Sequence, residues 1–149
     1  NEIGEFEIAV ELEPSPSPLP VRVDAMMFKR CIDNLIRNSR QAIAAGNRNG
    51  KLQADSREED RPPSASYMIH IGTYKSSEWA VLEINDSGPG IPQSDRNRVF
   101  DPYFTTRSEG SGLGLAIVKK VVLEHRGEIE CDQSRLGGAS FRIRLPLSR

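Results

Sequence analysis

Apolar side chains follow two different periods along this chain, and the order of those periods limits the folds that it can adopt. They alternate in five segments, as in strands with one buried face, and recur at helical spacing in two others. One pair of strands lies between the two helices and a second pair follows them. This order predicts an α+β fold, with one mixed sheet covered on one face by helices. The expected strands are 5–12, 67–75, 78–86, 128–132 and 139–147, with a short one at 21–23, and the expected helices are 25–45 and 113–125.

The segment EFEIAVEL shows the strand period clearly. Phe6, Ile8, Val10 and Leu12 share one face, and glutamates occupy the other. This pattern is typical of a strand with one face covered, so we expect the apolar face to pack on the core. We expect the first helix to begin after an N-cap residue, Asp24, and the second to end with a glycine cap at Gly127.

Length and composition narrow the possible functions. A chain of 149 residues, 37% of them hydrophobic, can bury one core, so we expect a single domain over 1–149, with 46–66 as a long polar loop. The net charge of −1 argues against nucleic-acid binding. Because no apolar run has the length of a membrane span, we also expect no membrane contact and a cytoplasmic location, although the parent protein could be anchored. The start at Asn1 without an initiator Met predicts a fragment of a longer protein.

Asp86 ends a predicted strand with the same parity as Leu82 and Ile84, which face the core. A buried carboxylate without a donor is costly, so something must donate to it. One interpretation is a ligand's amino group, with Gly88 and Gly90 letting the backbone close over a flat ring. The other is that Asp86 only caps the turn that follows. The residues alone leave both interpretations open.

Asn34 and Asn38 lie four residues apart on the first predicted helix. This spacing puts both amides on one flank, beside the apolar stripe. Amide oxygens suit a magnesium ion that keeps some of its waters and shares phosphate oxygens. The alternative is a pair of solvated asparagines on a polar helix face.

Gly110, Gly112 and Gly114 lie where the second helix begins, and exposed N–H groups at a helix start attract phosphate. Their spacing matches neither the Walker motif nor the dinucleotide fingerprint. Just before them, Phe100 and Phe104 are expected to hold an irregular segment on the core. Its polar residues would stay free, as in a hinged lid: Thr105, Thr106 and Arg107.

Four segments together resemble a known family. DNLIRNSRQAI, NDSGPGI, FDPYFTTR and GSGLGLAIVKKVV, in this order, resemble the N box, first glycine box, F box and second glycine box of the sensor histidine kinase catalytic domain. The resemblance covers nearly the whole chain. It implies the Bergerat ATP-binding fold of the GHKL superfamily, a two-layer α/β sandwich, with ATP and Mg²⁺ as ligands. The short stretch between Phe104 and Gly110 looks most like the nitrogen-regulatory branch, which has brief ATP lids.

The resemblance also implies roles for the candidate residues. Asp86 would accept a hydrogen bond from the adenine amine, Asn38 would hold the magnesium, and Asn34 would lie near the terminal phosphate as the second catalytic asparagine. The family often has threonine before the last strand, where this chain has Ala139, so a residue that helps bind adenine through water is missing. The other implied nucleotide-binding residues are Gly88, Gly90, Ile91, Thr105, Thr106, Arg107, Gly110, Ser111, Gly112, Leu113, Gly114 and Leu115.

The sequence lacks the family's phosphate acceptor. Family members phosphorylate a histidine that begins a His-Glu or His-Asp motif on a separate helical hairpin, and neither His70 nor His125 has that context. We therefore expect the chain to donate the γ-phosphate of Mg-ATP to a histidine on a dimerisation domain of the same parent protein, and indirectly to serve a response regulator. The alternatives are a GHKL ATPase, a serine kinase of the same fold and a non-catalytic nucleotide-sensing module.

Overall fold

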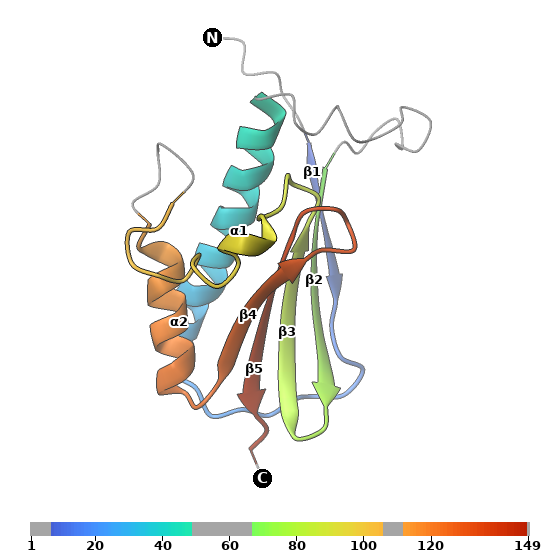
Figure 1. Cartoon of the computed structure of the whole chain (residues 1–149). Helices are drawn as coiled ribbons and strands as arrows, with labels where there is room; N and C mark the ends of the chain where they lie inside the picture. The colour runs from blue at the N-terminus through green and yellow to red at the C-terminus, as the bar shows by residue number, and fades with distance from the viewer. Residues whose placement is uncertain (1–6, 49–66, 106–111, 149) are drawn as a thin grey trace.

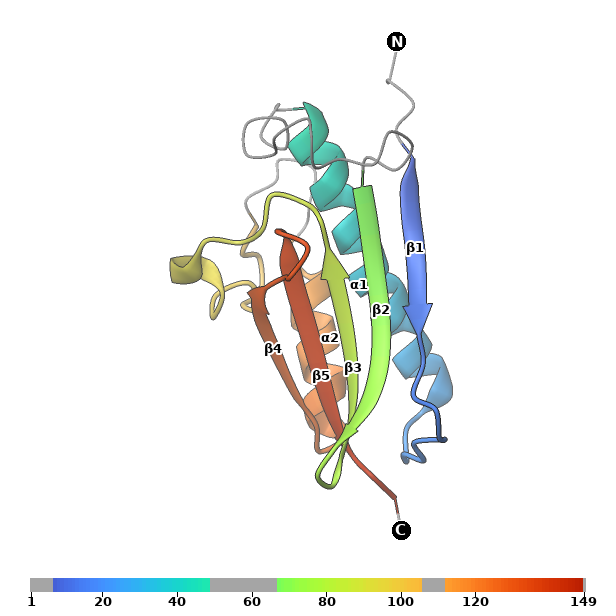
Figure 2. The same ribbon diagram turned by 90° about the vertical axis from the view of Figure 1, so that its right-hand side faces the viewer.

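Five strands form one mixed sheet in the computed structural model, which describes residues 7–48, 67–105 and 112–148. β1 is parallel to β2, and the other neighbouring pairs are antiparallel. Helices α1 (Ala25–Arg48) and α2 (Gly114–Glu124) cover one face of the sheet (Figures 1 and 2). The predicted α+β sandwich is therefore confirmed. The strands in spatial order are β1 (Ile8–Glu13), β2 (Tyr67–Ser76), β3 (Trp79–Asp86), β5 (Ala139–Pro146) and β4 (Glu128–Gln133).

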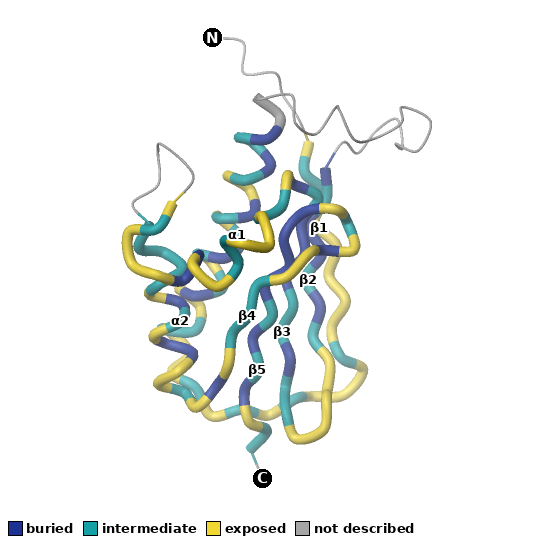
Figure 3. The backbone as a smooth tube through the Cα atoms, in the orientation of Figure 1, coloured by how far each residue is buried: buried dark blue, intermediate teal, exposed yellow. Residues whose placement is uncertain are grey.

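The core lies between the sheet and the two helices. Every fourth residue of α1 is buried, from Cys31 through Leu35 and Ser39 to Ile43, because this spacing keeps side chains on one stripe of a helix. Along most of the length of the central strands, buried residues alternate with intermediate ones (Figure 3). Their core residues include Ile69, Ile84, Phe141 and Ile143, and α2 adds Val118, Val121 and Val122.

The irregular segment between β3 and α2 also rests on this core, and it contains a short 3₁₀ helix, Gln93–Asp95. Phe100 is buried and meets Phe141 edge to face, with ring centroids 6.2 Å apart. Phe104 is partly buried against the same cluster. The prediction that these two aromatic residues hold the segment on the core is confirmed.

The limits of α1 agree with the sequence at one end only. The Oδ1 atom of Asp24 accepts the N–H of Met27 at 3.0 Å, as expected of an N-cap. At the other end the helix continues to Arg48, past the predicted end at Ala45. Residues 49–66 of the predicted loop lie outside the described part of the chain. Among the helices that are described, none has the length and apolar character needed to cross a membrane.

The end of α2 differs from the predicted glycine cap. Arg126 has the positive φ, 61°, that the prediction assigned to Gly127. Gly127 is instead needed for close packing, since a Cβ there would lie 2.5 Å from the carbonyl oxygen of Arg144. The glycine therefore lets the chain pass close to β5.

Two strand predictions were wrong in part. The expected strand at 21–23 is reduced to a single bridge between Val21 and Leu147. The apolar face of β1 is only partly covered: Ile8 packs against the core, but Val10 is 58% and Leu12 69% exposed. The helices pack mainly over β3 and β4, so they do not cover this edge strand. Phe6, predicted on the same face, lies outside the described residues.

The sheet face away from the helices carries a network of polar side chains. Arg142 donates to Glu83 at 3.2 Å and to Glu130 at 2.7 Å, while Asn85 and Tyr74 also donate to Glu83. Burial by itself raises the pKa of Glu83, but the hydrogen bonds from Asn85, Arg142 and Tyr74, with the charge of Arg142, outweigh it and lower the pKa below the usual value. The ionised form of Glu83 therefore stabilises the folded state.

The Glu83 network predicts a pH-dependent loss of stability. A carboxyl with a lowered folded pKa stabilises the protein above its unfolded pKa, and the effect is lost as the pH falls through the folded pKa. We expect Glu83→Gln to lower the free energy of unfolding by about 1–3 kcal/mol at neutral pH, and to make stability fall less steeply below about pH 4.3. Urea unfolding measured from neutral to acidic pH checks both. Glu128→Gln is the control, because its exposed carboxylate lies 3.9 Å from Arg144, and equal losses in the two variants would contradict the prediction.

Candidate functional site

A cavity of about 530 Å³ opens where β3 ends. Its walls come from three segments that are far apart in the sequence: the C-terminal half of α1, the turn after β3 and the connection between β4 and β5. These segments meet at the upper end of the sheet in Figure 1. Asn38, Asp86, Gly90 and Ile91, four of the predicted site residues, line this one cavity.

Asp86 is 1% exposed and shares the helix-covered face with its neighbour in the sheet, Ile69. Its Oδ1 atom accepts two backbone hydrogen bonds, from the N–H of Gly88 at 2.9 Å and of Ala139 at 3.1 Å. The first of these bonds is the turn cap of the simpler interpretation. The carboxylate also lines the cavity, so capping the turn and facing a ligand are compatible roles for one side chain.

Glycines bring the backbone unusually close to Asp86. A Cβ on Gly138 would collide with Oδ1 of Asp86, and it would also lie 2.5 Å from the Asp86 carbonyl oxygen. A Cβ on Gly88 would lie 3.0 Å from the same Oδ1. Gly90 has a φ of 80°, which favours glycine over any other residue. The turn after β3 and the start of β5 can therefore enclose the carboxylate only with these glycines in place.

The two asparagines of α1 are placed differently. Asn38 lines the cavity together with Asp86, whereas Asn34, one helical turn earlier, is partly buried but does not line it. Ala42 and Ala45 follow Asn38 in the same wall, and their small side chains leave room between the helix and the glycine turn. Asn38 and Asp86 thus line one cavity, so a single ligand can reach both side chains.

The predicted phosphate-binding segment is only partly described. Thr105 is exposed beside the start of this segment, and Gly112 has a φ of 73° and accepts the N–H of Tyr103 at 2.9 Å. Leu113 caps the start of α2, whose first residues are Gly114 and Leu115. These residues do not line the cavity with Asp86. The remaining predicted positions, Thr106, Arg107, Gly110 and Ser111, lie outside the described residues.

Several cavity residues were missed from the sequence. Arg96 lines the wall, and its guanidinium donates to the carbonyl of Ile91 at 3.2 Å and to Asp132 at 3.4 Å. Gln133 lines the wall from the end of β4, close to Ala139, the position of the missing threonine. No local signal marks Arg96 or Gln133, and Gln133 reaches the site only because β5 pairs with both β3 and β4. The glycine before Ala139 was the one available hint.

Ala139 occupies the position where the resemblance implies a threonine. Its backbone N–H donates to Asp86, but its methyl group cannot bind water as the hydroxyl of a threonine would. Ser140 pairs with Asn85 in the sheet and therefore faces away from Asp86. The hydroxyl of Ser140 therefore cannot replace that of the missing threonine.

Cys131 lies near the site but is not a nucleophile. The pKa of its thiol is raised to about 12, mainly by burial; Arg96 opposes this increase, and the charges of Asp86 and Asp132 add to it. The thiol is neutral at physiological pH, and the thiolate is the reactive form. The polar groups that can act on a ligand in this cavity are therefore a carboxylate, amides and a guanidinium.

Comparisons with known proteins identify a family model and several relatives that match this chain. The family model for the histidine kinase-, DNA gyrase B- and HSP90-like ATPases matches residues 23–149. The nitrogen regulation protein NtrY of Azorhizobium caulinodans is 37% identical over 128 residues, which are 85% of this chain and 15% of NtrY. The sensory histidine kinase/phosphatase NtrB of Rhizobium leguminosarum is 46% identical over 66 residues, 44% of this chain and 17% of NtrB. The chain thus spans less than a fifth of either relative.

Solved structures show the same fold. A mycobacterial sensor histidine kinase, MprB, superposes with a TM-score of 0.72 at 30% identity, covering 94% of this chain and 82% of that one. The histidine kinase ThkA in complex with its response regulator TrrA has a TM-score of 0.67 at 25% identity, covering 95% of this chain and 34% of that one. The arrangement of sheet and helices described above is therefore shared with known histidine kinases.

The crowding around Asp86 predicts that position 138 requires glycine. Gly138→Ala would force a methyl group against the Asp86 carboxylate, so we expect the free energy of unfolding to fall by about 1–3 kcal/mol. Gly114→Ala is the matched control, because a Cβ at this first helical residue meets nothing within 4 Å. Thermal unfolding compares the two. A stable Gly138→Ala variant would show that the packing around Asp86 is looser than described.

Proposed function

This chain belongs to the family of histidine kinase-, DNA gyrase B- and HSP90-like ATPases, and we propose that it binds Mg-ATP and donates the γ-phosphate to a histidine on a separate domain. Its identification from four motifs as the catalytic ATP-binding domain of a sensor histidine kinase, of nitrogen-regulatory type, is confirmed by the family match and by the relatives NtrY and NtrB. The acceptor domain and the response regulator belong to the proposal, since the chain spans only 15% of NtrY.

The observation that carries the proposal is the buried carboxylate of Asp86 in the wall of the cavity. An ionised carboxylate only accepts hydrogen bonds, so it selects a ligand edge that donates. The exocyclic amine of adenine is such a donor, whereas guanine has a carbonyl oxygen at the same ring position. Two backbone donors hold the carboxylate in place, which supports a preorganised contact with the purine.

Asn38 supports the position of the phosphates. Its side chain lines the same cavity as Asp86 but comes from the opposite layer of the sandwich, so a single nucleotide can reach both. An amide oxygen fits magnesium, which prefers hard oxygen ligands and retains waters. A magnesium ion bound there would offset negative charge on the phosphates during transfer. The guanidinium of Arg96 adds positive charge at the cavity wall.

Phosphoryl transfer requires mainly positioning and charge neutralisation from the protein. In the proposed reaction an imidazole nitrogen of the partner domain attacks the γ-phosphorus in line, a nitrogen–phosphorus bond forms, and the bond to the β–γ bridging oxygen breaks to release ADP. This chain needs no general base, since the attacking nitrogen has a free lone pair. Backbone N–H groups of the glycine-rich segment that begins at Gly110 would stabilise the phosphate charge, with Thr105, Thr106 and Arg107 in the lid.

One position of α1 distinguishes the ATPase alternative from the kinase. The chaperone and mismatch-repair ATPases of the superfamily have a water-activating glutamate where this chain has Asn34, so the residue present favours transfer over hydrolysis. A serine kinase of the same fold would give a phosphoester, which is stable in acid, unlike phosphohistidine. A nucleotide-sensing module would bind ATP and transfer its γ-phosphate to no acceptor. The alternatives can therefore be told apart by what forms: free phosphate, an acid-stable phosphoester or no phosphorylated product.

Two substitutions test nucleotide binding. Calorimetric titration with Mg-ATP should show a saturable site in the wild type and binding at least about tenfold weaker in Asp86→Asn, because the amide puts a donor against the adenine amine. Asn38→Ala should bind ATP with the magnesium dependence lost. GTP should bind the wild type much more weakly than ATP.

Asp33→Asn is the control for both, because it removes one carboxylate from the exposed side of α1. It should bind Mg-ATP like the wild type. Circular dichroism confirms that each variant is folded, since Asp86→Asn keeps an oxygen for the two backbone donors. Full binding by folded Asp86→Asn would disprove the adenine contact.

Transfer itself is tested with radiolabelled ATP and a purified histidine-bearing dimerisation domain of a nitrogen-regulatory kinase. We expect labelled acceptor whose label is lost in acid, as for phosphohistidine, and no label when the acceptor histidine is replaced by glutamine. Free phosphate released at the same rate without any acceptor would favour the ATPase instead. An acid-stable label would favour the serine kinase.

A further inference from the structure

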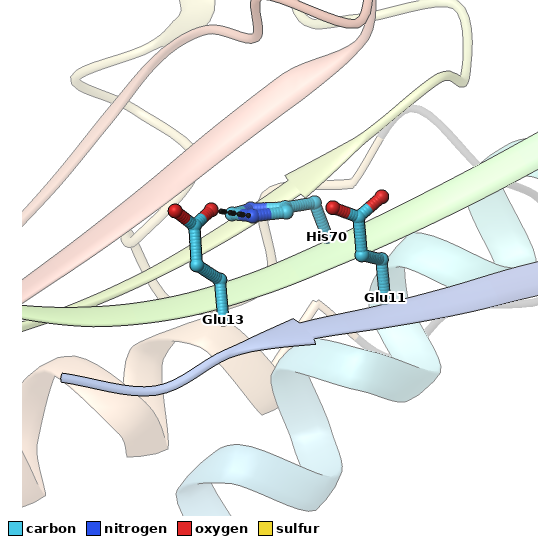
Figure 4. A group of neighbouring side chains, drawn as sticks. All are labelled: Glu11, Glu13 and His70. Carbon is cyan, nitrogen blue, oxygen red and sulfur yellow. Dashed lines mark hydrogen bonds and ion pairs between the residues drawn. The ribbon is translucent and has the colours of Figure 1, made fainter. Parts of the chain in front are cut away.

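Three ligand-type side chains gather on the sheet face away from the helices, which is the opposite face from the one that Asp86 shares with the nucleotide cavity. Glu11 and Glu13 come from β1, and His70 comes from β2. The parallel register pairs Glu11 with His70 and Glu13 with Gly72, which brings the three side chains to the same face. Figure 4 shows the imidazole between the two carboxylates. We call this group the edge cluster.

The imidazole is the buried member of the edge cluster. His70 is 6% exposed, and its Nε2 atom lies 2.8 Å from Oε2 of Glu13. One ligand atom from each of the three residues lies within 4.8 Å of the others. The ring lies against Gly72, where a Cβ would be 3.1 Å from Cε1 of His70, so the glycine makes room beside it.

One nitrogen of this buried ring has no hydrogen-bond partner among the described residues. With Nε2 donating to Glu13, the lone pair on Nδ1 has no donor, and in the other tautomer the Nδ1 proton has no acceptor. Buried polar atoms are nearly always satisfied, so the hydrogen bonding of this ring is incomplete within the described residues. This observation distinguishes the edge cluster from a simple group of surface acids.

The charge of the edge cluster also favours a cation. Within the described residues, His70 is the one basic group paired with Glu13, and the nearby arginines of the same face, Arg142 and Arg144, pair with other acids. A neutral imidazole leaves two carboxylates uncompensated. A divalent cation bound by Nε2 would neutralise both, and it would replace the hydrogen bond between Nε2 and Glu13 while the ring proton moves to Nδ1.

We propose that Glu11, Glu13 and His70 bind a divalent cation of the zinc class. Imidazole suits Zn²⁺ and its neighbours in the first transition row, whereas Mg²⁺ and Ca²⁺ prefer oxygen ligands alone. Bonds of about 2.0–2.2 Å require ligand atoms about 3.4 Å apart in a tetrahedral site. Because both glutamates are exposed and have rotatable side chains, they can close from the observed 4.8 Å, with water in the fourth position.

A cation at this place would join β1 to β2 through side chains as well as backbone. β1 is an edge strand with exposed apolar residues on its other face, so few side-chain contacts hold it to the sheet. A ligand that binds only the folded state raises the unfolding temperature. Zinc is thus expected to stabilise the attachment of β1, independently of the nucleotide.

Calorimetric titration of this chain with zinc chloride, without nucleotide or magnesium, tests the site. We expect one saturable site and a rise in Tm in the wild type. Affinity should fall at least about tenfold in Glu11→Gln and in His70→Gln. Glu11→Gln is exposed and keeps the fold, so it decides the outcome if His70→Gln is unstable. Glu7→Gln is the matched control, since it removes an exposed acid that lies four residues before Glu11 and outside the edge cluster.

Cobalt substitution provides an independent readout. Co²⁺ bound by carboxylates and imidazole gives weak visible bands without the thiolate charge-transfer band that Cys31 or Cys131 would produce. The proposal is overturned by no saturable zinc binding, by unchanged affinity in Glu11→Gln, or by a thiolate band that disappears in Cys131→Ser. Mg-ATP binding should be equal in wild type and Glu11→Gln, so a failure here leaves the nucleotide proposal intact.

Discussion

A single buried carboxylate determines how the upper end of this domain is built. Asp86 is placed on the core-facing side by the period of β3, where an ionised group is tolerated only with donors around it. Those donors are backbone N–H groups of Gly88 and Ala139, from two segments that are far apart in the sequence. The need to satisfy one side chain therefore holds the glycine turn and the start of β5 together, and the cavity wall is the result.

The two faces of the sheet serve different purposes. The face under the helices is mostly apolar, and Asp86 is the one carboxylate among its buried described residues, which makes it a candidate for function. The opposite face is polar, and the ion pair between Glu83 and Arg142 stabilises it, whereas packing against the helices stabilises the first face. At the edge of this polar face, His70 is buried without full hydrogen bonding, which is why the edge cluster differs from the paired charges in the middle.

Local patterns predicted most of the helices and strands because each pattern depends only on residues that are close together in the sequence. The alternation through β3 and the helical spacing of α1 were correct, since each depends on one element having one buried side. The exposed Val10 and Leu12 of β1 were not foreseen, because alternation shows that a strand has an apolar face and not whether a helix is long enough to cover it. Arg96 was missed for a similar reason: nothing beside it in the sequence marks the wall that it joins.

The sequence by itself determined the chemistry of the domain: an acid at the end of a core strand, two amides one helical turn apart, and glycines around them, in an order shared with the sensor histidine kinases. It could do so because these features are set by residue type and short spacing. Only the tertiary structure decided which of them meet. It brings Asn38 and not Asn34 into the cavity with Asp86, and it sets His70 beside Glu11 and Glu13. These meetings depend on strand order and register, which follow from packing over the whole chain.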